Sequence, residues 1–438
     1  MRCMKLLSLT RLVTAAPLLG LGLVIASGEA DGQVVNPSSS YGGASDPNPY
    51  YIGVSEALTH DSNVYRIAGG PADSYSSTSL FGGFDQQISR QRVFARASVS
   101  ANRYREQDPL NNNGYSFYGG LDWETVEHLS GNVYAAYDHS LAAPVAAPGV
   151  PVQQTKNIAD LASVSARARW GGPSLFTIEG ALNYASVNYS EPTYITSESS
   201  TSAASLGVYY HSGGPLRVGL AARVTRNDIP KAFIDPLTNE YVSSQIDGRN
   251  IDLLLDYDVT GQIVANARLS YTKQKNSLGN TDYSGFTGGV ALDWRATGKT
   301  SLRFDAAHDA GFNAQAYNTF IFSPTVTGIT LTPIVGVYTN NSITDSAGLG
   351  ISYSATAKIS ATGTLRYLRA RTRALSVTGP LPDVVDIYKL ASIGANYAIT
   401  RAWGAGCNLG YETRDVTGGQ VFSYNAKTVS CSTQFVWR

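Results

Sequence analysis

Between residues 50 and 438, segments in which apolar and polar side chains alternate with a period of two recur along the chain, and few folds accept this pattern over so long a stretch. Residues 176–184, 216–225 and 286–295 show it most clearly. In residues 216–225, one parity carries Leu216, Val218, Leu220, Ala222 and Val224, and the other carries Arg217, Gly219, Ala221, Arg223 and Thr225. A period of two indicates β-strands whose two faces meet different surroundings.

The connections between these segments alternate in length. Short ones lie at 170–173, 211–215, 259–262, 296–299, 355–358 and 399–401, and an aromatic residue usually precedes them, as at Tyr210, Tyr257, Trp294, Tyr353 and Tyr397. Longer polar or proline-containing connections lie near 105–114, 140–156, 227–242, 310–338 and 374–385. Short turns at one end, long loops at the other and aromatic residues at a rim are typical of a transmembrane β-barrel.

We therefore predict an all-β fold over residues 50–438, a transmembrane antiparallel up-and-down β-barrel of about eighteen strands. The first strand starts near Tyr51 and the last ends at Arg438, and an even strand count places both barrel ends on the periplasmic side. A soluble sandwich or solenoid also alternates, but seldom with every second connection short. The last strand ends in Phe435 and Trp437, which resembles the signal read by the outer-membrane insertion machinery, although Arg438 departs from it.

Residues 1–30 have the features of a cleaved secretory signal peptide. They combine a basic start, an apolar segment over 12–25 and small residues at Gly28 and Ala30. A buried helix or a membrane anchor is the alternative. Residues 31–49, rich in Ser, Gly, Asn and Pro, predict a flexible periplasmic leader. We therefore expect export through the inner membrane to the cell outer membrane.

Charge and motifs argue against nucleic acid and against an enzyme. The formal net charge is +0 at pH 7, so we expect no nucleic-acid partner. The 5 His residues show no metal-ligand spacing, and there is neither a Gly-x-Ser-x-Gly elbow nor a phosphate-binding glycine loop. We expect no cofactor, metal or catalytic residue, with a Ser/His/acid set at one rim as the alternative. Expected partners are outer-membrane lipid and lipopolysaccharide, the barrel-insertion machinery, and polysaccharide or small polar solutes.

One parity of the strands carries polar and charged side chains that we assign to the lumen. An Arg or Lys on the lipid face costs about 2–4 kcal/mol at the membrane centre, so these residues must point inward. The assigned residues are Arg96, Asn102, Arg167, Glu179, Asn183, Arg217, Arg223, Asn266, Arg268, Asp293, Arg303, Asp305 and Arg366, together with Ser163, Ser165 and Asp252. They fit either a polar track for anionic or sugar solutes or the ion pairs of any barrel interior, and inward Tyr118 and Tyr134 are placed to stack on sugar rings.

Two further segments suggest specific features. Leu141–Val152 is apolar and proline-rich, which predicts a loop folded into the lumen as a constriction. The alternative is a loop that packs over the rim or contacts a partner. The final hairpin turns near Gly418 and Gly419, and Cys407 and Cys431 lie at equal distances from that turn. They should therefore face each other on the lipid side, as a cross-strand disulfide in an oxidising compartment or as two small apolar neighbours.

The segment Tyr51–Arg66 ends in Asp61-Ser62-Asn63-Val64-Tyr65-Arg66. This acidic-x-Asn-hydrophobic-aromatic-Arg stretch resembles the first strand of the β-barrel porin 2 family. The aromatic-x-x-Thr turns at Tyr257–Gly261 and Trp294–Gly298 are similar to repeats of that family. Several members are associated with exopolysaccharide export, so the resemblance implies a role in polysaccharide secretion, and it supplies no catalytic residues.

The sequence thus predicts an outer-membrane channel or conduit, with exopolysaccharide secretion implied by the family resemblance. A general or substrate-selective diffusion porin is the first alternative. A structural or adhesive surface barrel with a plugged lumen is the second, and a barrel enzyme is the third. The transported solute and the oligomeric state do not follow from the sequence.

Overall fold

The computed structural model describes residues 49–438 apart from 143–155, 172–173, 212, 235–237, 259–260, 279–281, 326–327, 374, 377–378, 381–383 and 418–422. Eighteen strands form one sheet. They are β1 (Tyr50–Asp61), β2 (Asp73–Ile88), β3 (Gln91–Tyr104), β4 (Asn112–Glu124), β5 (Leu129–Leu141), β6 (Ile158–Trp170), β7 (Phe176–Tyr189), β8 (Ser199–His211), β9 (Leu216–Ile234), β10 (Tyr241–Asp258), β11 (Ile263–Asn276), β12 (Tyr283–Trp294), β13 (Thr300–Thr325), β14 (Gly328–Ser354), β15 (Ile359–Arg373), β18 (Val384–Ala398), β19 (Trp403–Thr417) and β20 (Tyr424–Trp437).

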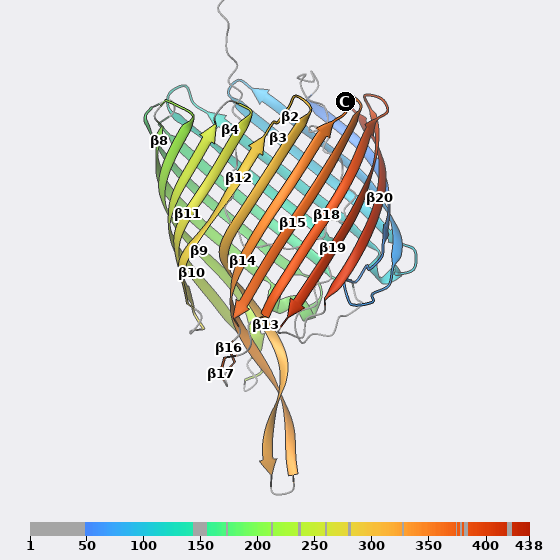
Figure 1. The fold of residues 1–438 in the computed structure, drawn as a ribbon, viewed down its shortest axis with the longest axis vertical. Helices are drawn as coiled ribbons and strands as arrows, with labels where there is room; N and C mark the ends of the chain where they lie inside the picture. Colours follow the sequence, from blue (N-terminus) through green and yellow to red (C-terminus); the bar gives the residue numbers. More distant parts are fainter. Residues whose placement is uncertain are drawn as a thin grey trace, which may run out of the picture.

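Each of these strands pairs antiparallel with its neighbours in sequence, so the sheet is a meander (Figure 1). The short β16 (Leu375–Ser376) and β17 (Gly379–Pro380) pair only with each other, and β15 pairs directly with β18. The last strand then pairs with the first, with Ile52 opposite Trp437, and closes the barrel. The predicted all-β, up-and-down barrel of eighteen strands is therefore confirmed.

The connections separate into two ends of the barrel, drawn at the top and bottom of Figure 1. The predicted short turns all fall between consecutive strands at the end where the chain terminates. The other end carries the longer connections, two of which contain the short 3₁₀ helices η1 (Asp108–Leu110) and η2 (Pro192–Ser197). No helix in the described part of the chain is long and apolar enough to cross a membrane.

Two predicted loops are wrong. Most of 227–242 belongs to β9 and β10, and 310–338 lies almost wholly within β13 and β14, whose paired backbones extend well beyond the barrel wall (Figure 1). Backbone hydrogen bonds maintain a hairpin whatever its side-chain pattern, so the loss of alternation did not mark the strand ends. Pro230 is accommodated because the β9–β10 register shifts between Val242 and Ser244.

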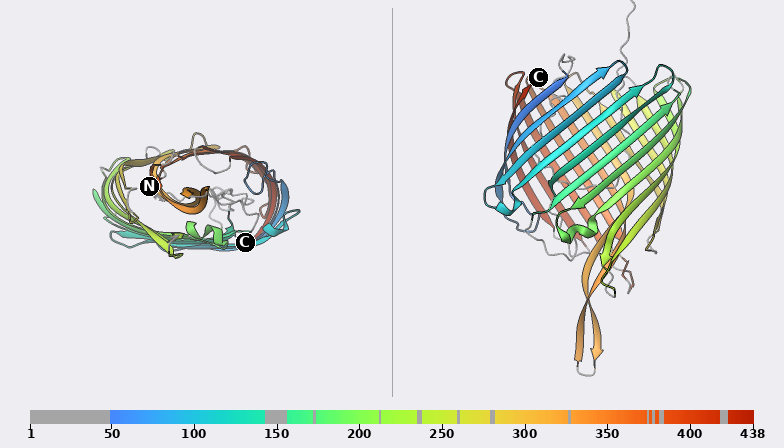
Figure 2. Two further views of the ribbon diagram at one scale, coloured as in Figure 1. Left: turned by 90° about the horizontal axis from the view of Figure 1, so that it is seen from below. Right: turned by 180° about the vertical axis from the view of Figure 1, so that it is seen from behind.

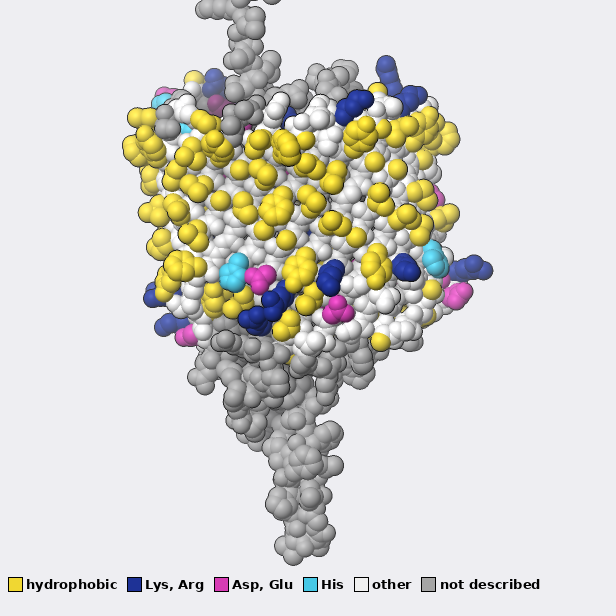
Figure 3. All heavy atoms as spheres, viewed as in Figure 1, with side chains coloured by type: hydrophobic (Ala, Val, Ile, Leu, Met, Phe, Trp, Pro, Cys, Tyr) yellow, Lys and Arg dark blue, Asp and Glu magenta, His cyan; other side chains and the backbone are white. Residues whose placement is uncertain are grey.

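Apolar side chains cover the outside of the barrel as a band (Figure 3). Aromatic residues border this band at both ends: Trp403 and Tyr411 stand on the same face of β19 and are 45% and 47% exposed. The eight residue-to-residue steps from one to the other span roughly 27 Å of strand, or about 20 Å of height at a barrel tilt of ~40°. The chain is a transmembrane β-barrel.

Three predicted segments lie outside the described residues. These are the signal peptide at 1–30, nearly all of the leader at 31–49, and most of the apolar loop Leu141–Val152. The prediction that this loop narrows the pore therefore stays a prediction.

A matched pair of substitutions tests the assignment of the two faces of β18. Ile393 is 62% exposed on the outer face, whereas Ser392 points inward. We expect Ile393→Arg to lower the free energy of unfolding by about 2–4 kcal/mol, because a charge would sit in lipid. Ser392→Arg should cost far less, since the lumen holds polar side chains. Denaturant titration of both variants in lipid vesicles measures the difference, and equal losses would contradict the assignment.

Candidate functional site: the barrel lumen and the closing seam

The residues assigned to the lumen from the sequence all lie on barrel strands, on the parity opposite to the exposed apolar side chains. They are Arg96, Asn102, Arg167, Glu179, Asn183, Arg217, Arg223, Asn266, Arg268, Asp293, Arg303, Asp305 and Arg366, with Tyr118 and Tyr134. The outer face shows the opposite character. Leu182, which precedes Asn183, is 62% exposed there, and Leu220, near Arg217 in sequence, is 60% exposed. That these residues line a permeation path stays a prediction.

Among the described residues, the largest luminal ion cluster surrounds Glu179, whose side chain is almost fully buried on β7. Its carboxylate lies 2.7 Å from Arg169, 3.4 Å from Arg167 and 3.3 Å from Arg217. Arg217 also lies 3.3 Å from Asp256. Strands β6, β7, β9 and β10 thus contribute one network near the short-turn end, and its charges largely neutralise each other.

A glycine supports this cluster. The guanidinium of Arg217 stacks over the ring of Tyr209, 3.7 Å from its centroid. The ring in turn lies against Gly219, where any Cβ atom would overlap it. Only glycine leaves the space in which Tyr209 lies flat under Arg217, so the wall of β8 and β9 positions the arginine.

Two further luminal arginines are also paired. Arg223 binds Asp252 at 2.8 Å, and both side chains are buried. Arg268 binds Asp309 at 2.8 Å, across β12 from β11 to β13. Arg303 approaches Asp293 more loosely, at 3.9 Å.

Some predicted lumen residues have no charged partner. Within the described part of the chain, Arg96, Asp305 and Arg366 form no ion pair. Asn102 donates instead to Asn112, at 2.9 Å. Because of the ion pairs described above, the inner wall from β6 to β13, here called the charged arc, carries many charges that mostly neutralise each other.

Aromatic rings form a second luminal group on β3, β4 and β5. The rings of Phe94, Tyr118 and Tyr134 lie with their centroids 5.5 to 6.4 Å apart, and Tyr118 is 46% exposed. Tyr134 donates a hydrogen bond to Asp122, and Arg92 lies over the ring of Phe94 at 4.9 Å. This group places aromatic faces on the inside of the barrel in its short-turn half.

The wall from β14 through β20 differs in composition from the charged arc. Its inward positions in the middle of the strands carry mainly Ser, Thr, Asn, Gln and Gly, as at Ser352, Gly350, Thr362, Thr364, Asn396, Gly394, Ser392, Asn408, Gly406, Gln434, Ser432 and Ser430. Neighbouring side chains cover several of these glycines; the Asn396 amide, for instance, lies over Gly406. The result is a luminal surface of hydroxyl and amide groups with few charges.

At the long-loop end, segments from opposite parts of the sequence approach one another. The helix η2, between β7 and β8, contacts both β9 and β13, and β13 itself contacts β9. Figure 2 shows η2 and the β13–β14 hairpin inside the outline of the barrel when it is viewed from that end. These elements lie at the long-loop mouth of the barrel, where the sequence predicts a constriction by the loop Leu141–Val152 instead.

The motif Asp61–Arg66 starts at the last residue of β1, continues into the following loop and forms a clasp at the closing seam. Arg66 binds Asp61 at 2.7 Å and also contacts Glu412 of β19, and all three side chains are buried. Burial lowers the pKa of Arg66, but the two carboxylates raise it by more, so its pKa lies above the usual value and the side chain stays charged. Asn63 donates to the backbone of Asn425 at 3.0 Å. The motif therefore ties the first strand to the last two.

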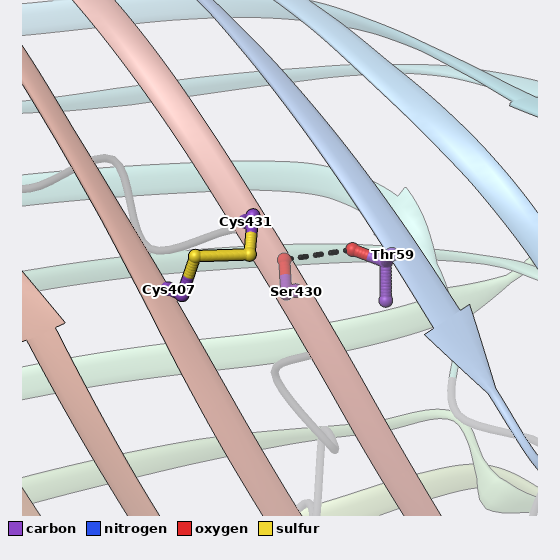
Figure 4. The surroundings of a disulfide bond; sticks show 4 residues. All are labelled: Thr59, Cys407, Ser430 and Cys431. Carbon is purple, nitrogen blue, oxygen red and sulfur yellow. Dashed lines mark hydrogen bonds between the residues drawn. A yellow bond between two sulfur atoms is a disulfide. The ribbon is translucent and has the colours of Figure 1, made fainter.

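Cys407 and Cys431 lie directly opposite each other and are joined by a disulfide, with their Cα atoms 4.0 Å apart (Figure 4). Both share the outer parity with Leu409 and Val429 and lie in the middle of the apolar band. One strand further, Thr59 and Ser430 hydrogen-bond at 2.8 Å on the luminal side and join β1 to β20. The last hairpin is thus held covalently beside the seam.

Sequence reasoning missed several luminal residues, including Arg92, Phe94, Arg169, Asp256 and Asp309. Each has the same parity as a residue that was assigned, so strict application of the period of two would have found them. Their pairing could not have been found, because it depends on the strand register and, for Arg268 with Asp309, on two strands that are not neighbours. Among the described residues, no group of three or more His, Cys, Asp or Glu is arranged to hold a metal ion.

Comparisons with known proteins find only distant structural likeness, which adds nothing to the fold described above. No family model and no curated protein matches the chain. Among solved structures, the siderophore receptor PirA from Acinetobacter baumannii is 7% identical, with a TM-score of 0.43 over 90% of this chain and 81% of that chain. A ferric enterobactin receptor mutant (PfeA) from Pseudomonas aeruginosa is 8% identical, with a TM-score of 0.45 over 89% and 82%. The copper transporter OprC is 9% identical, with a TM-score of 0.38 over 88% and 80%. Likeness at this level says nothing of what this chain carries.

Removing the disulfide tests its contribution to stability. The bond closes a loop with a sequence separation of 24, for which the chain-entropy model gives about 3 kcal/mol. We expect Cys407→Ser together with Cys431→Ser to lower the free energy of unfolding by that amount in denaturant titrations. Alkylation of the denatured, unreduced wild type should label neither residue, and free thiols at both positions would rule the bond out.

The Glu179 cluster is tested by a double substitution. Glu179→Gln leaves three arginines with Asp256 as their remaining carboxylate, so we expect a loss of about 2 kcal/mol, discounted because the arginines are partly exposed. Adding Arg169→Gln should recover part of the loss, because one unpaired cation is removed. Denaturant titration of the single and double variants gives the coupling energy. Additive losses would show that the cluster is not a unit.

Proposed function

We propose that the protein is an outer-membrane conduit for a polar, carbohydrate-type solute, and that exopolysaccharide export is its role. The aromatic group of Phe94, Tyr118 and Tyr134 carries the proposal. Aromatic faces inside a water-filled barrel bind the apolar faces of sugar rings, and Tyr118 is 46% exposed to such contact. A plain ion channel has no use for them.

The two luminal walls support the same class of solute. Hydroxyl and amide side chains from β14 to β20 offer donors and acceptors to sugar hydroxyls without fixing them by charge. On the facing arc, Glu179, Arg223 and Arg268 are already paired, so the arc presents little uncompensated charge. A lumen of this kind favours a neutral or weakly charged polar chain over a small ion.

The direction of the barrel is part of the proposal. Outer-membrane barrels place short turns in the periplasm and long loops outside. The aromatic group lies in the short-turn half, so a saccharide leaving the periplasm meets it early. The resemblance of Asp61–Arg66 to the β-barrel porin 2 family supports the export role.

The proposed conduit is tested by measuring whether a sugar blocks the current through single channels. In planar lipid bilayers, we expect the purified barrel to conduct and a linear glucose hexasaccharide to interrupt the current. Tyr118→Ala and Tyr134→Ala should each raise the half-blocking concentration roughly three- to tenfold, because a stacking face is lost. Phe117→Ala is the matched control, since that ring lies next to Tyr118 on the outer face.

The other outcomes decide between the alternatives. A barrel that never conducts is a plugged structural barrel, and one that conducts without sugar block is a general diffusion porin. Export is tested in the native cell, where deletion of the chain should leave polysaccharide in the periplasm and off the surface. Normal surface polysaccharide in the deletion strain would refute the export role.

A further inference from the structure

Four cations gather on the outer face of β9, β10 and β11, close to the long-loop end. They are Arg226, Arg249, Lys273 and Lys275, which we call the basic patch. All four are exposed and share the parity of lipid-facing residues such as Leu253 and Leu269. They therefore point away from the lumen and take no part in the conduit.

The strand register brings like charges together in this patch. Arg249 lies directly opposite Lys273, and Lys275 lies opposite Asp247. Asp247 is engaged by Arg226 at 3.0 Å, while neither Arg249 nor Lys275 forms an ion pair with any carboxylate in the described part of the chain. Like charges that face each other across a sheet are destabilising unless an anion lies between them.

The remaining charges near the patch do not balance it. Among the described residues of β9, β10 and β11, only Asp228 and Asp247 share this outer face, so the four cations outnumber the nearby carboxylates two to one. The ammonium group of Lys273 stands 5.8 Å from the centre of the Tyr271 ring, an aromatic rather than an anionic partner. The patch thus lacks the counter-charge that would make its register favourable.

The patch stands at the depth of lipid headgroups. Tyr271 belongs to the aromatic border of the apolar band, and Lys273 and Lys275 follow it on the same face of β11. Each step of two residues adds roughly 5 Å of height for a tilted strand, so the ammonium groups lie just beyond the acyl chains. Figure 3 shows charged side chains gathered at this long-loop border of the band.

We propose that the basic patch binds the phosphate groups of a phosphorylated glycolipid, lipid A, in the outer leaflet. Arginine forks bind phosphate oxygens with two parallel hydrogen bonds, and flanking lysines add point charges. A phosphate between Arg249 and Lys273 removes the repulsion that their register imposes. The proposal rests on the outer-membrane location proposed above but not on conduction.

Native mass spectrometry of the purified barrel in neutral detergent tests this site, with bis-phosphorylated lipid A as the probe. We expect the triple variant Arg249→Gln, Lys273→Gln and Lys275→Gln to bind about a hundredfold more weakly than wild type. The matched control removes three cations at the short-turn end, through Lys299→Gln, Lys358→Gln and Arg401→Gln, and should bind normally. Heat-modifiable migration on gels confirms that both variants remain folded.

Three results would overturn the proposal. Equal weakening by both triple variants would mean that overall charge, not the basic patch, attracts the lipid. Equal binding of dephosphorylated lipid A would show that phosphate is not recognised, and equal binding of phosphatidylglycerol would show that the glycolipid is not. None of these readouts depends on channel conductance, so a failed conduit and a failed lipid site are distinguishable.

Discussion

Hydrogen bonding of the backbone in lipid is the constraint on which the rest of this structure depends. No water is present in the hydrocarbon region to bind a free N–H or C=O group, so a sheet can cross it only if it has no edge. Here that condition is met at one place, where β1 pairs with β20. The register of this pair fixes the tilt and circumference of the barrel, and every other strand position follows from it.

The seam is accordingly held by side-chain contacts as well as by the backbone. On the luminal side Thr59 hydrogen-bonds to Ser430, and Arg66, which follows β1, joins Asp61 to Glu412. These contacts connect residues from the two ends of the barrel sequence, so they form only in the closed state. The clasp therefore favours closure over any open or misregistered sheet, which gives a structural reason for the residue pattern in Asp61–Arg66.

A closed barrel also places apolar side chains on the lipid face and polar side chains on the luminal face, and this separation made much of the fold predictable. Alternation is a local property, so the all-β class, the strand count and the lumen-facing parity followed from the sequence. The opposition of Cys407 and Cys431 on the last two strands also followed from it. The long β13–β14 hairpin was missed because its pairing continues where alternation does not. The Glu179 cluster was missed as a unit because its arginines come from β6 and β9, and only the register brings them together.

The disulfide has a consequence for the order of events during biogenesis. Once the barrel is inserted, both sulfur atoms face acyl chains, where water-soluble oxidants and thiol reductants do not reach. The bond must therefore form while the last hairpin is still in an aqueous compartment, and it cannot readily be undone afterwards. Oxidation precedes insertion, and β20 enters the membrane already linked to β19.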